Sequence, residues 1–300
     1  MNSSIYGYLT VFHAIVREGS IARAARKLEI APPSVSQALK LLEQHIGLPL
    51  FNRTTRKIEL TEAGQRLYEN TQSAMQTLEF AVEEVQDLGN TPSGLVRITV
   101  ARFAYLSIIQ PHLGEFCERY PDIQLEISIN DGTVDILKEG FDLGIRYGDR
   151  VEENMVARQL LPPVTQGLFA SRAYLARYGE PKKPTDLQQH KLIGWRFTTS
   201  NRLSPLTVQD KGQEIQVEMP MPLIVNNIDT ANDAVRQGVG IGRVFLPVLE
   251  KQADKADFIP VMEKYWISYP PVYLYYLQNS QKAGRVRALI EFLIEKTEAS

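Results

Sequence analysis

The N-terminal part of the chain carries apolar residues at helical spacing, interrupted by one short break. Two stripes stand on either side of this break: Ala24, Ala25 and Leu28 in the first, and Val35, Leu39 and Leu42 in the second. Ser20 is placed to cap the first helix, and Pro32-Pro33 suits the first turn of the second. The spacing therefore predicts two short helices joined by a tight bend over about residues 20–40. This is either a helix-turn-helix or an ordinary αα-hairpin.

The polar side of the second predicted helix carries side chains suited to a DNA groove: Ser34, Ser36, Gln37 and Lys40. Short hydroxyls and an amide near the start of an exposed helix can reach base edges, and an ammonium can reach a phosphate. A small hairpin predicted over about residues 50–60 places Arg53 and Arg56 on its outside, beside that helix. These six residues are the candidate DNA-binding residues. A solvated surface is the alternative for the charged ones.

A long helix is predicted from Thr61 to about Leu88, where Gly89 and the polar residues after it end the pattern. Its apolar positions alternate steps of four and three, at Leu67, Thr71, Ala74, Leu78, Ala81, Val85 and Leu88. This is the seam of a coiled coil, so we expect the helix to pair with a second copy. The alternative is a single amphipathic helix docked on its own chain.

Residues 12–64 resemble the N-terminal domain of the LysR-type transcriptional regulators. The resemblance is carried by Gly19-Ser20, Ala24-Ala25, Pro33, Val35-Ser36, Leu42-Glu43, Gly47, Leu50-Phe51, Arg53 and the run from Leu60 to Gly64. It implies a winged helix-turn-helix DNA-binding domain over residues 1–61 and a dimerising linker helix over 62–89. One departure is Pro32, where the family often has a glutamine that reaches a base edge. Base reading therefore shifts toward Ser34, Gln37 and the wing.

Beyond Gly94 the pattern changes to alternating strands and helices. Residues 95–100 and 123–129 are predicted strands on either side of a helix over 106–119, which makes a βαβ unit. The alternation continues to residue 296, and about 200 residues of this kind can form two modest α/β lobes. The resemblance implies a two-lobed effector domain like the periplasmic binding proteins over residues 94–300. Lobe I would take 94–164 and 267–300, and lobe II 165–266, with Tyr269-Pro-Pro271 as a crossover.

Candidate effector-binding residues follow from position. In two-lobed α/β proteins a ligand lies at the carboxyl ends of strands and the amino ends of helices. This rule and the resemblance nominate Ala101, Arg102, Phe103, Asn130, Arg146, Arg196, Phe197 and Asn226. Arg102, Arg146 and Arg196 would suit a carboxylate or another small anion. The alternative is that Arg146 pairs with a neighbour such as Asp131 and that Arg196 is a surface residue.

Charge is unevenly distributed along the chain. Residues 1–60 carry eight Lys and Arg against four Asp and Glu, whereas the other 240 residues carry 25 against 31, within a net charge of −2. A basic N-terminal segment would supply the salt-sensitive part of DNA binding, and the acidic remainder of the chain would oppose non-specific binding to DNA.

Several catalytic and metal signals are missing from the sequence. The four histidines lack metal-ligand spacing, Cys117 is the single cysteine, and no nucleophile motif is visible. The glycines from Gly238 to Gly242 follow a predicted helix rather than a strand, so we interpret them as a helix-ending turn and not a dinucleotide loop. We therefore expect no catalytic residues, no metal, no cofactor and no enzyme activity.

Together these patterns predict a multidomain protein: an all-α winged helix-turn-helix, a long linker helix and an α/β two-lobed effector domain. The expected function is a sequence-specific transcriptional regulator of the LysR type that is controlled by a small-molecule effector. Expected partners are double-stranded promoter DNA, an effector hypothesised to be anionic, a second copy through the linker helix, a homotetramer and RNA polymerase.

The sequence shows no apolar run near the length of a membrane span and no cationic signal region, so we expect a cytoplasmic protein. The alternatives from other classes are a periplasmic-type solute-binding protein and a small-molecule enzyme with an added helical domain. The missing export signal argues against the first, and the missing catalytic constellation argues against the second.

Overall fold

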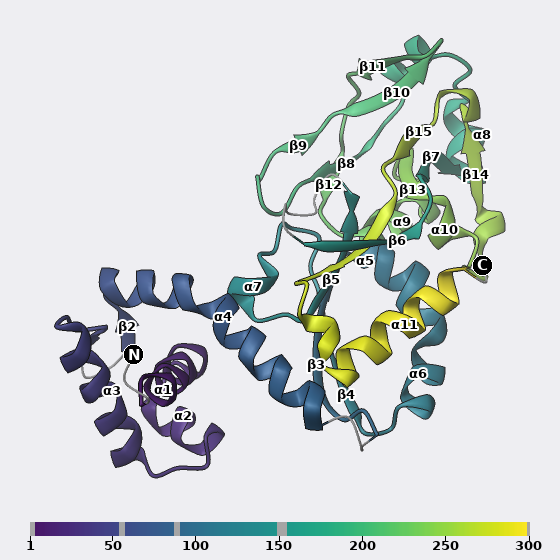
Figure 1. Ribbon diagram of the computed structural model, residues 1–300. Helices are drawn as coiled ribbons and strands as arrows, with labels where there is room; N and C mark the ends of the chain where they lie inside the picture. The colour runs from purple at the N-terminus through teal and green to yellow at the C-terminus, as the bar shows by residue number, and fades with distance from the viewer. Residues whose placement is uncertain (1–3, 54–57, 87–90, 149–154, 299–300) are drawn as a thin grey trace. The chain divides into compact units, whose positions relative to one another are not determined.

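The computed structural model describes residues 4–53, 58–86, 91–148 and 155–298 (Figure 1). The chain divides into two compact units, Met1–Val82 and Glu83–Ser300. Apolar clusters form a separate core in each. In the part of the chain that the structure describes, no helix is both long and apolar enough to cross a membrane.

The first unit is helical, with one small hairpin. Its elements are α1 (Ile5–Glu18), α2 (Ile21–Lys27), α3 (Pro32–Ile46), β1 (Phe51–Arg53), β2 (Ile58–Leu60) and α4 (Glu62–Gln86), which continues across the unit boundary. Ser20 caps α2 by accepting a hydrogen bond from the Arg23 backbone N–H at 3.4 Å, as predicted. The bend before α3 places Glu29 in the left-handed region, at φ 55°. The helix-turn-helix is therefore present at the predicted place.

The predicted hairpin is also present. β1 and β2 pair antiparallel, with Phe51 opposite Leu60 and Arg53 opposite Ile58. Residues 54–57, which include Arg56, lie outside the described residues.

The core of the first unit is made by the two predicted stripes and by α1. Its fully buried members are Phe12, Ile15, Ala24, Ala25, Val35, Leu42 and Leu50. Leu39 is also buried, and Leu28 packs against the cluster while partly exposed. Alanines at the crossing of α2 with its neighbours allow close approach of the helices. This packing fixes α3 in place from its apolar side.

A tight junction joins the hairpin to the start of α4. The Thr61 hydroxyl donates to the Pro49 carbonyl at 2.7 Å and accepts from the Gly64 backbone N–H at 3.1 Å. A Cβ atom at Gly64 would lie 2.1 Å from the Leu50 carbonyl oxygen. Only glycine therefore allows α4 to start this close to the preceding chain.

The predicted coiled-coil seam of α4 is only partly free. Thr71 donates from its hydroxyl to the Leu67 carbonyl at 2.6 Å and lies 2.7 Å from the His13 Nε2 atom, and Leu67 packs on the core of the first unit. The expectation that these two positions face a partner is wrong, because the chain's own α1 and core occupy them. Ala74 and Leu78 are exposed, and so is Val85.

Within the second unit, lobe I is built on one five-stranded sheet with the order β4-β3-β5-β16-β6. Its strands are β3 (Gly94–Val100), β4 (Ile123–Ile129), β5 (Leu143–Tyr147), β6 (Val156–Leu161) and β16 (Val272–Tyr276). β3 runs parallel to β4 and β5, and β16 runs antiparallel to β5 and β6. α7 (Ile136–Glu139) precedes β5, and the C-terminal α11 (Gly284–Glu298) packs on β3 and β6.

The continuous helix predicted over residues 106–119 is wrong. The segment forms α5 (Arg102–Ala104), a π-helical turn over Tyr105–Ile109, a 3-10 turn over Gln110–His112 and α6 (Leu113–Arg119). Pro111 causes the break, because proline lacks the N–H that an α-helix needs and its ring collides with the preceding turn.

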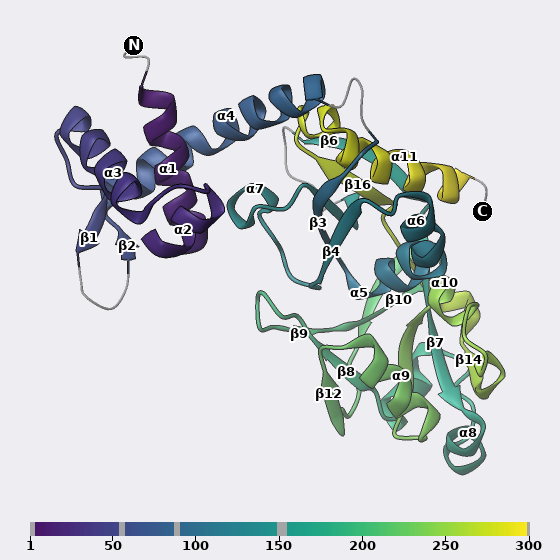
Figure 2. The same cartoon turned by 90° about the horizontal axis from the view of Figure 1, so that it is seen from below.

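Lobe II contains two sheets and a hairpin (Figure 2). The central strand β7 (Val164–Ser171) pairs antiparallel with β13 (Gly242–Phe245), β14 (Phe258–Val261) and β15 (Ile267–Tyr269). The second sheet has the order β12-β8-β9, formed by Leu223–Val225, Ile193–Arg196 and Leu203–Ser204, and the hairpin joins β10 (Leu206–Asp210) to β11 (Gln213–Val217). The helices are α8 (Arg172–Tyr178), α9 (Ile228–Arg236) and α10 (Leu246–Leu249).

Two proline pairs connect the lobes. Pro162-Pro163 lies between β6 and β7, and Pro270-Pro271 lies between β15 of one sheet and β16 of the other. The predicted limits of lobe I, 94–164 and 267–300, are wrong at Val164 and at 267–269, because β7 and β15 pair with each other in the sheet of lobe II. Gly238 follows α9 with φ 70°, so the glycine run begins with a helix-ending turn as predicted.

His13 is a buried histidine at the contact between α1 and α4. Thr71 already donates its hydroxyl proton to Leu67, so its oxygen accepts from the His13 Nε2–H, while the buried Nδ1 atom has no hydrogen-bond partner among the described residues. Burial, with a smaller contribution from Arg17, lowers the pKa of His13 from 6.5 to about 4. The ring is therefore neutral in the folded protein near neutral pH.

We expect Gly64→Ala to destabilise the first unit by about 1–3 kcal/mol, because the added methyl group must displace the Leu50 carbonyl. Urea unfolding of the full chain followed by circular dichroism measures the effect. Gly7→Ala is the matched control, since a Cβ there meets nothing within 4 Å and α1 gains a better helix former. Equal unfolding midpoints for the two variants would contradict the close-approach argument.

We expect acid to destabilise the first unit through His13. Between pH 6.5 and 4 the unfolded histidine binds a proton that the folded one does not, so stability falls as pH falls, by about 2 kcal/mol from pH 7 to pH 5. Hydrogen exchange of α1 amides in the full chain, corrected for intrinsic rates, measures this change. His13→Gln keeps an N–H for Thr71 and removes the titration. The prediction fails if the variant shows the same loss of protection as the parent.

Candidate functional site

The first candidate site is the outer face of α3. Ser34, Ser36, Gln37 and Lys40 are all exposed, whereas Val35, Leu39 and Leu42 on the opposite side are buried in the core. The Ser36 hydroxyl donates to the Pro32 carbonyl at 3.2 Å, so its lone pairs remain to accept from a donor outside the helix. Arg53 stands at the end of β1, next to the hairpin tip. Four of the six predicted residues therefore share one exposed helix.

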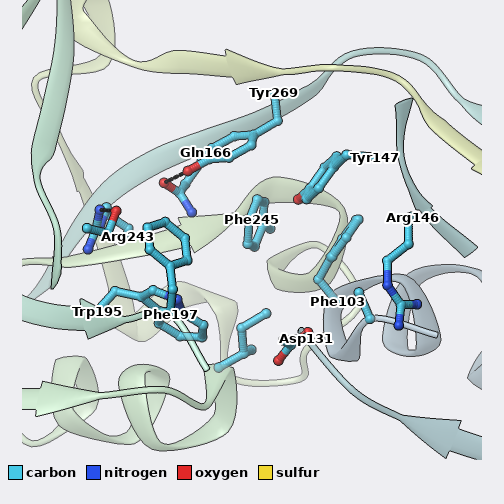
Figure 3. Close-up of a pocket in the computed structure, with 13 residues that line it drawn as sticks. Phe103, Asp131, Arg146, Tyr147, Gln166, Trp195, Phe197, Arg243, Phe245 and Tyr269 are labelled. Atoms are coloured by element: carbon cyan, nitrogen blue, oxygen red, sulfur yellow. Dashed lines mark hydrogen bonds between the residues drawn. The ribbon is translucent and has the colours of Figure 1, made fainter. Parts of the chain in front are cut away.

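The second candidate site is a cavity of about 90 Å³ between the two lobes of the second unit. Lobe I contributes the segments that follow β3 and β4 and the end of β5, which are the carboxyl ends of its parallel strands. Lobe II contributes β7, the segment from β8 to β9, the start of α9, and β13 and β15. Figure 3 shows the side chains that surround the cavity.

Aromatic rings from both lobes form one wall of the cavity. Phe103 stacks on Tyr147 of β5 at 4.6 Å between centroids and on Phe245 of β13 at 5.0 Å. Tyr269 of β15 lies 5.2 Å from Tyr147 and 5.5 Å from Phe245. Trp195 and Phe197, at and after the end of β8, also line the cavity. The wall is therefore largely aromatic, with the polar groups confined to a few positions.

Two arginines reach the cavity from opposite sides in Figure 3. Arg146 of β5 is buried and donates to the Thr99 hydroxyl at 3.0 Å and to the Ile145 carbonyl at 2.8 Å. Arg243 of β13 donates through Nη1 to the Ser204 hydroxyl at 2.8 Å and to the Pro205 carbonyl at 3.1 Å. Burial lowers the pKa of the Arg243 guanidinium, and the nearby Tyr269 raises it.

The structure brings together half of the predicted effector residues. Ala101, Phe103, Arg146 and Phe197 line the cavity, whereas Arg102, Asn130, Arg196 and Asn226 are not part of its lining. Asn130 accepts from the Gly132 backbone N–H at 2.8 Å in a local turn, and Asn226 is exposed.

The predicted convergence of three arginines on one anion is not seen. Arg102 donates through Nε to the Asp229 carboxylate of α9 at 2.9 Å, so it is already paired, across the two lobes. Arg196 donates to the Asn201 carbonyl at 2.7 Å within its own turn. Of the three, only Arg146 lines the cavity.

Sequence reasoning missed most of lobe II's contribution, above all Gln166, Arg243 and Phe245. These residues lie in antiparallel strands, to which the rule about carboxyl ends of parallel strands does not apply. Arg243 and Phe245 are two positions apart, so their side chains share one face of β13. That period of two was the available signal, but the strand has only four residues and follows a glycine run interpreted as a turn.

Among the described residues no cluster of His, Cys, Asp and Glu could hold a metal ion. His13 contacts Thr71, and the His190 Nδ1 atom lies 3.3 Å from the Tyr174 hydroxyl, so both rings make structural contacts.

An exposed recognition-type helix in one unit and a ligand-sized cavity between α/β lobes in the other define a ligand-responsive DNA-binding regulator. Comparison with known families agrees. Residues 7–65 match the bacterial regulatory helix-turn-helix family of lysR type, and residues 89–298 match the LysR substrate binding domain. The chain belongs to the LysR family of transcriptional regulators, with a helix-turn-helix DNA-binding domain followed by an effector-binding domain.

Relatives and solved structures support this assignment. The chain is 32% identical to the uncharacterized HTH-type transcriptional regulator YcaN of Escherichia coli, over 94% of this chain and 92% of that protein. It is 30% identical to the regulator PgrR of the same organism, over 89% and 90%. CrgA, a LysR-type regulator from Neisseria meningitidis, superposes with a TM-score of 0.62 at 26% identity, covering 99% of each chain.

A more distant structure shows the shared fold. The full-length Vibrio cholerae virulence activator AphB has a TM-score of 0.61 at 24% identity, over 97% of this chain and 99% of that one. The relatives named here are transcriptional regulators and not enzymes, in agreement with the expectation from the sequence.

Proposed function

We propose that the chain binds promoter DNA in a sequence-specific manner through α3 and the hairpin beside it. Ser34, Ser36 and Gln37 would contact base edges in the major groove, and Lys40, Arg53 and Arg56 would contact phosphates. The observation that carries this proposal is the two-sided character of α3, where four polar side chains are exposed and the apolar row behind them is buried. An exposed Ser36 oxygen that already donates within the helix suits an amino group of adenine or cytosine.

The cavity between the lobes is the proposed effector site. Its lining comes from both lobes, so a bound molecule contacts the two at once and favours one arrangement of them over others. We propose the division into a DNA-binding domain over residues 1–61, a linker helix over 62–89 and an effector domain over 94–300. A change in the effector domain would then alter how the copies of the protein meet on DNA.

The free part of α4 supports pairing with a second copy. Ala74, Leu78, Val82 and Val85 are exposed, and the last three have 47%, 56% and 67% of their surface accessible. They follow one another in steps of four, four and three along the helix, which is a continuous apolar row. In a dimer, two α3 helices about 34 Å apart would read a site with two-fold symmetry. A homotetramer, contact with RNA polymerase and a cytoplasmic location complete the proposal.

We expect Lys40→Ala to weaken binding of the full chain to DNA from its own promoter region and to unrelated DNA alike. Loss of one phosphate contact should make the negative slope of log affinity against log salt concentration shallower by about 1. Fluorescence anisotropy at several salt concentrations gives the slope. Lys138→Ala on exposed α7 of the effector domain is the matched control.

Gln37→Ala separates base reading from charge. This variant should keep the parent's salt slope and lose preference among promoter sequences that differ at single base pairs. An unchanged slope for Lys40→Ala, or an unchanged sequence preference for Gln37→Ala, would remove that residue from the proposed interface. No preference of the parent chain for its promoter DNA would overturn the proposed function itself.

We expect Leu78→Glu to dissociate the pair of linker helices, because it places a charge in the middle of the apolar row. Sedimentation of the full chain at micromolar concentration measures the mass. Ser73→Glu is the matched control: it is exposed and lies about 140° around the helix from Leu78. Equal masses for both variants would show that the row is not the contact between copies.

A further inference from the structure

Arg243 presents a buried donor that the protein itself does not use. Its Nη2 atom is inaccessible to solvent and has no hydrogen-bond partner among the residues that the structure describes. A buried polar atom of this kind costs stability unless a water, an ion or a ligand completes its bonding. Arg243 lines the cavity, so a molecule bound there lies beside its guanidinium, and a small rotation of the side chain would bring an acceptor of that molecule to Nη2.

Among the residues that the structure describes, Arg243 has no acidic partner. Nη1 is held by two neutral oxygens, the Ser204 hydroxyl and the Pro205 carbonyl. The one carboxylate in the cavity lining is Asp131, which accepts from the Arg102 backbone N–H at 2.8 Å. In Figure 3, Asp131 lies on the side of Phe103 and Arg146, and Arg243 lies on the opposite side of the view. The end of the cavity at Arg243 is therefore positively charged and suited to an anionic group.

The other side chains that line the cavity determine which uncharged part of a ligand fits. The rings of Phe245, Trp195 and Phe197 face the same space, and aromatic rings pack favourably against another ring at offset or edge positions. The volume of about 90 Å³ is below the roughly 150 Å³ of an apolar cavity that can hold benzene, so the cavity excludes a ligand of more than one ring. Arg146, the other arginine of the lining, already donates to the Thr99 hydroxyl and the Ile145 carbonyl, and Asp131 adds a negative charge to the lining. A second anionic group on the ligand is therefore disfavoured.

We propose that the effector cavity binds a single-ring aromatic compound with one anionic group, a carboxylate in the simplest case, and that Arg243 holds this group through Nη2. The inference rests on the proposed function, in which this cavity is the effector site. It replaces the three arginines expected from the sequence with one that lies in an antiparallel strand of lobe II.

The test uses the full chain and four probe compounds in low-chloride buffer. Benzoate and phenylacetate carry a ring and one charge, benzamide lacks the charge, and cyclohexanecarboxylate lacks the aromatic ring. Calorimetry measures each affinity, and quenching of tryptophan fluorescence in a Trp266→Phe background, where Trp195 is the remaining tryptophan, reports occupancy of the cavity. We expect at least one aromatic acid to bind about tenfold or more tightly than both benzamide and cyclohexanecarboxylate.

Variants assign the charge to one residue. Arg243→Gln should reduce affinity for the aromatic acid about tenfold or more and leave benzamide binding unchanged, and Arg243→Lys, which keeps the charge, should lose less. Arg196→Gln is the matched control, because Arg196 is a half-buried arginine of lobe II that lies outside the cavity lining. Near-ultraviolet circular dichroism of each variant shows whether lobe II is folded. If Arg243→Gln does not fold, the comparison of Arg243→Lys with Arg196→Gln decides.

Three outcomes would overturn the proposal: no binding of either aromatic acid, equal affinity for benzamide, or equal losses in Arg243→Gln and Arg196→Gln. Binding of cyclohexanecarboxylate as tightly as benzoate would remove the aromatic part. DNA binding of the same preparations is measured in parallel. Intact promoter binding with no aromatic acid bound refutes the ligand class alone, whereas loss of promoter preference refutes the proposed function.

Discussion

The effector domain depends on one contact, the packing of aromatic rings across its two lobes. Phe103 and Tyr147 come from lobe I, and Phe245 and Tyr269 come from lobe II, with centroid separations from 4.6 to 5.5 Å between neighbouring rings. Each ring buries a large apolar surface, and the pairs gain further from their relative orientation. This cluster joins the two lobes and forms a wall of the cavity. The Arg102–Asp229 pair adds a charged link between the lobes, at partly exposed positions where such a pair contributes little.

The DNA-binding unit is the part of the fold that the sequence predicts best, because its signals are local. Ser20, the prolines at the start of α3 and the stripes at helical spacing act within a few residues of where they stand. The need for glycine at position 64 is visible only in the structure, because a Cβ atom there would collide with the Leu50 carbonyl, which is distant in sequence. The predicted coiled-coil seam of α4 is wrong at Leu67 and Thr71, because residues distant in sequence cover these two positions. A helical period shows that a face is apolar, but not whether the chain itself or a partner covers that face.

In the effector domain, the predicted cavity residues at the carboxyl ends of parallel strands were correct. The predictions were wrong for residues whose contacts lie far away in the sequence. The ends of the parallel strands β3 and β5 gave Ala101, Phe103 and Arg146. Arg102 was misassigned because its partner Asp229 is 127 positions away, on a helix of the other lobe. Arg243 was missed because β13 has only four residues and follows a glycine-rich turn, so its alternation is too short to recognise. Antiparallel strands place functional side chains along their length, and spacing alone does not show which of those side chains meet.

These contacts limit how a ligand could act on the protein. A ligand shifts a conformational equilibrium only by the difference between its affinities for the two conformations. The aromatic wall is already formed by rings from both lobes. Apolar contacts between a ligand and this wall therefore stabilise an arrangement that the protein already adopts without a ligand. An anion at Arg243 is different, because it can accept a hydrogen bond from the buried Nη2 atom, which has no partner among the described residues. The two partners of this guanidinium, Ser204 and Pro205, lie in lobe II, so an anion held at Arg243 is linked to lobe I only through the part of the ligand that touches the ring wall. The charged group therefore holds the ligand in lobe II, and its ring is the part that contacts lobe I.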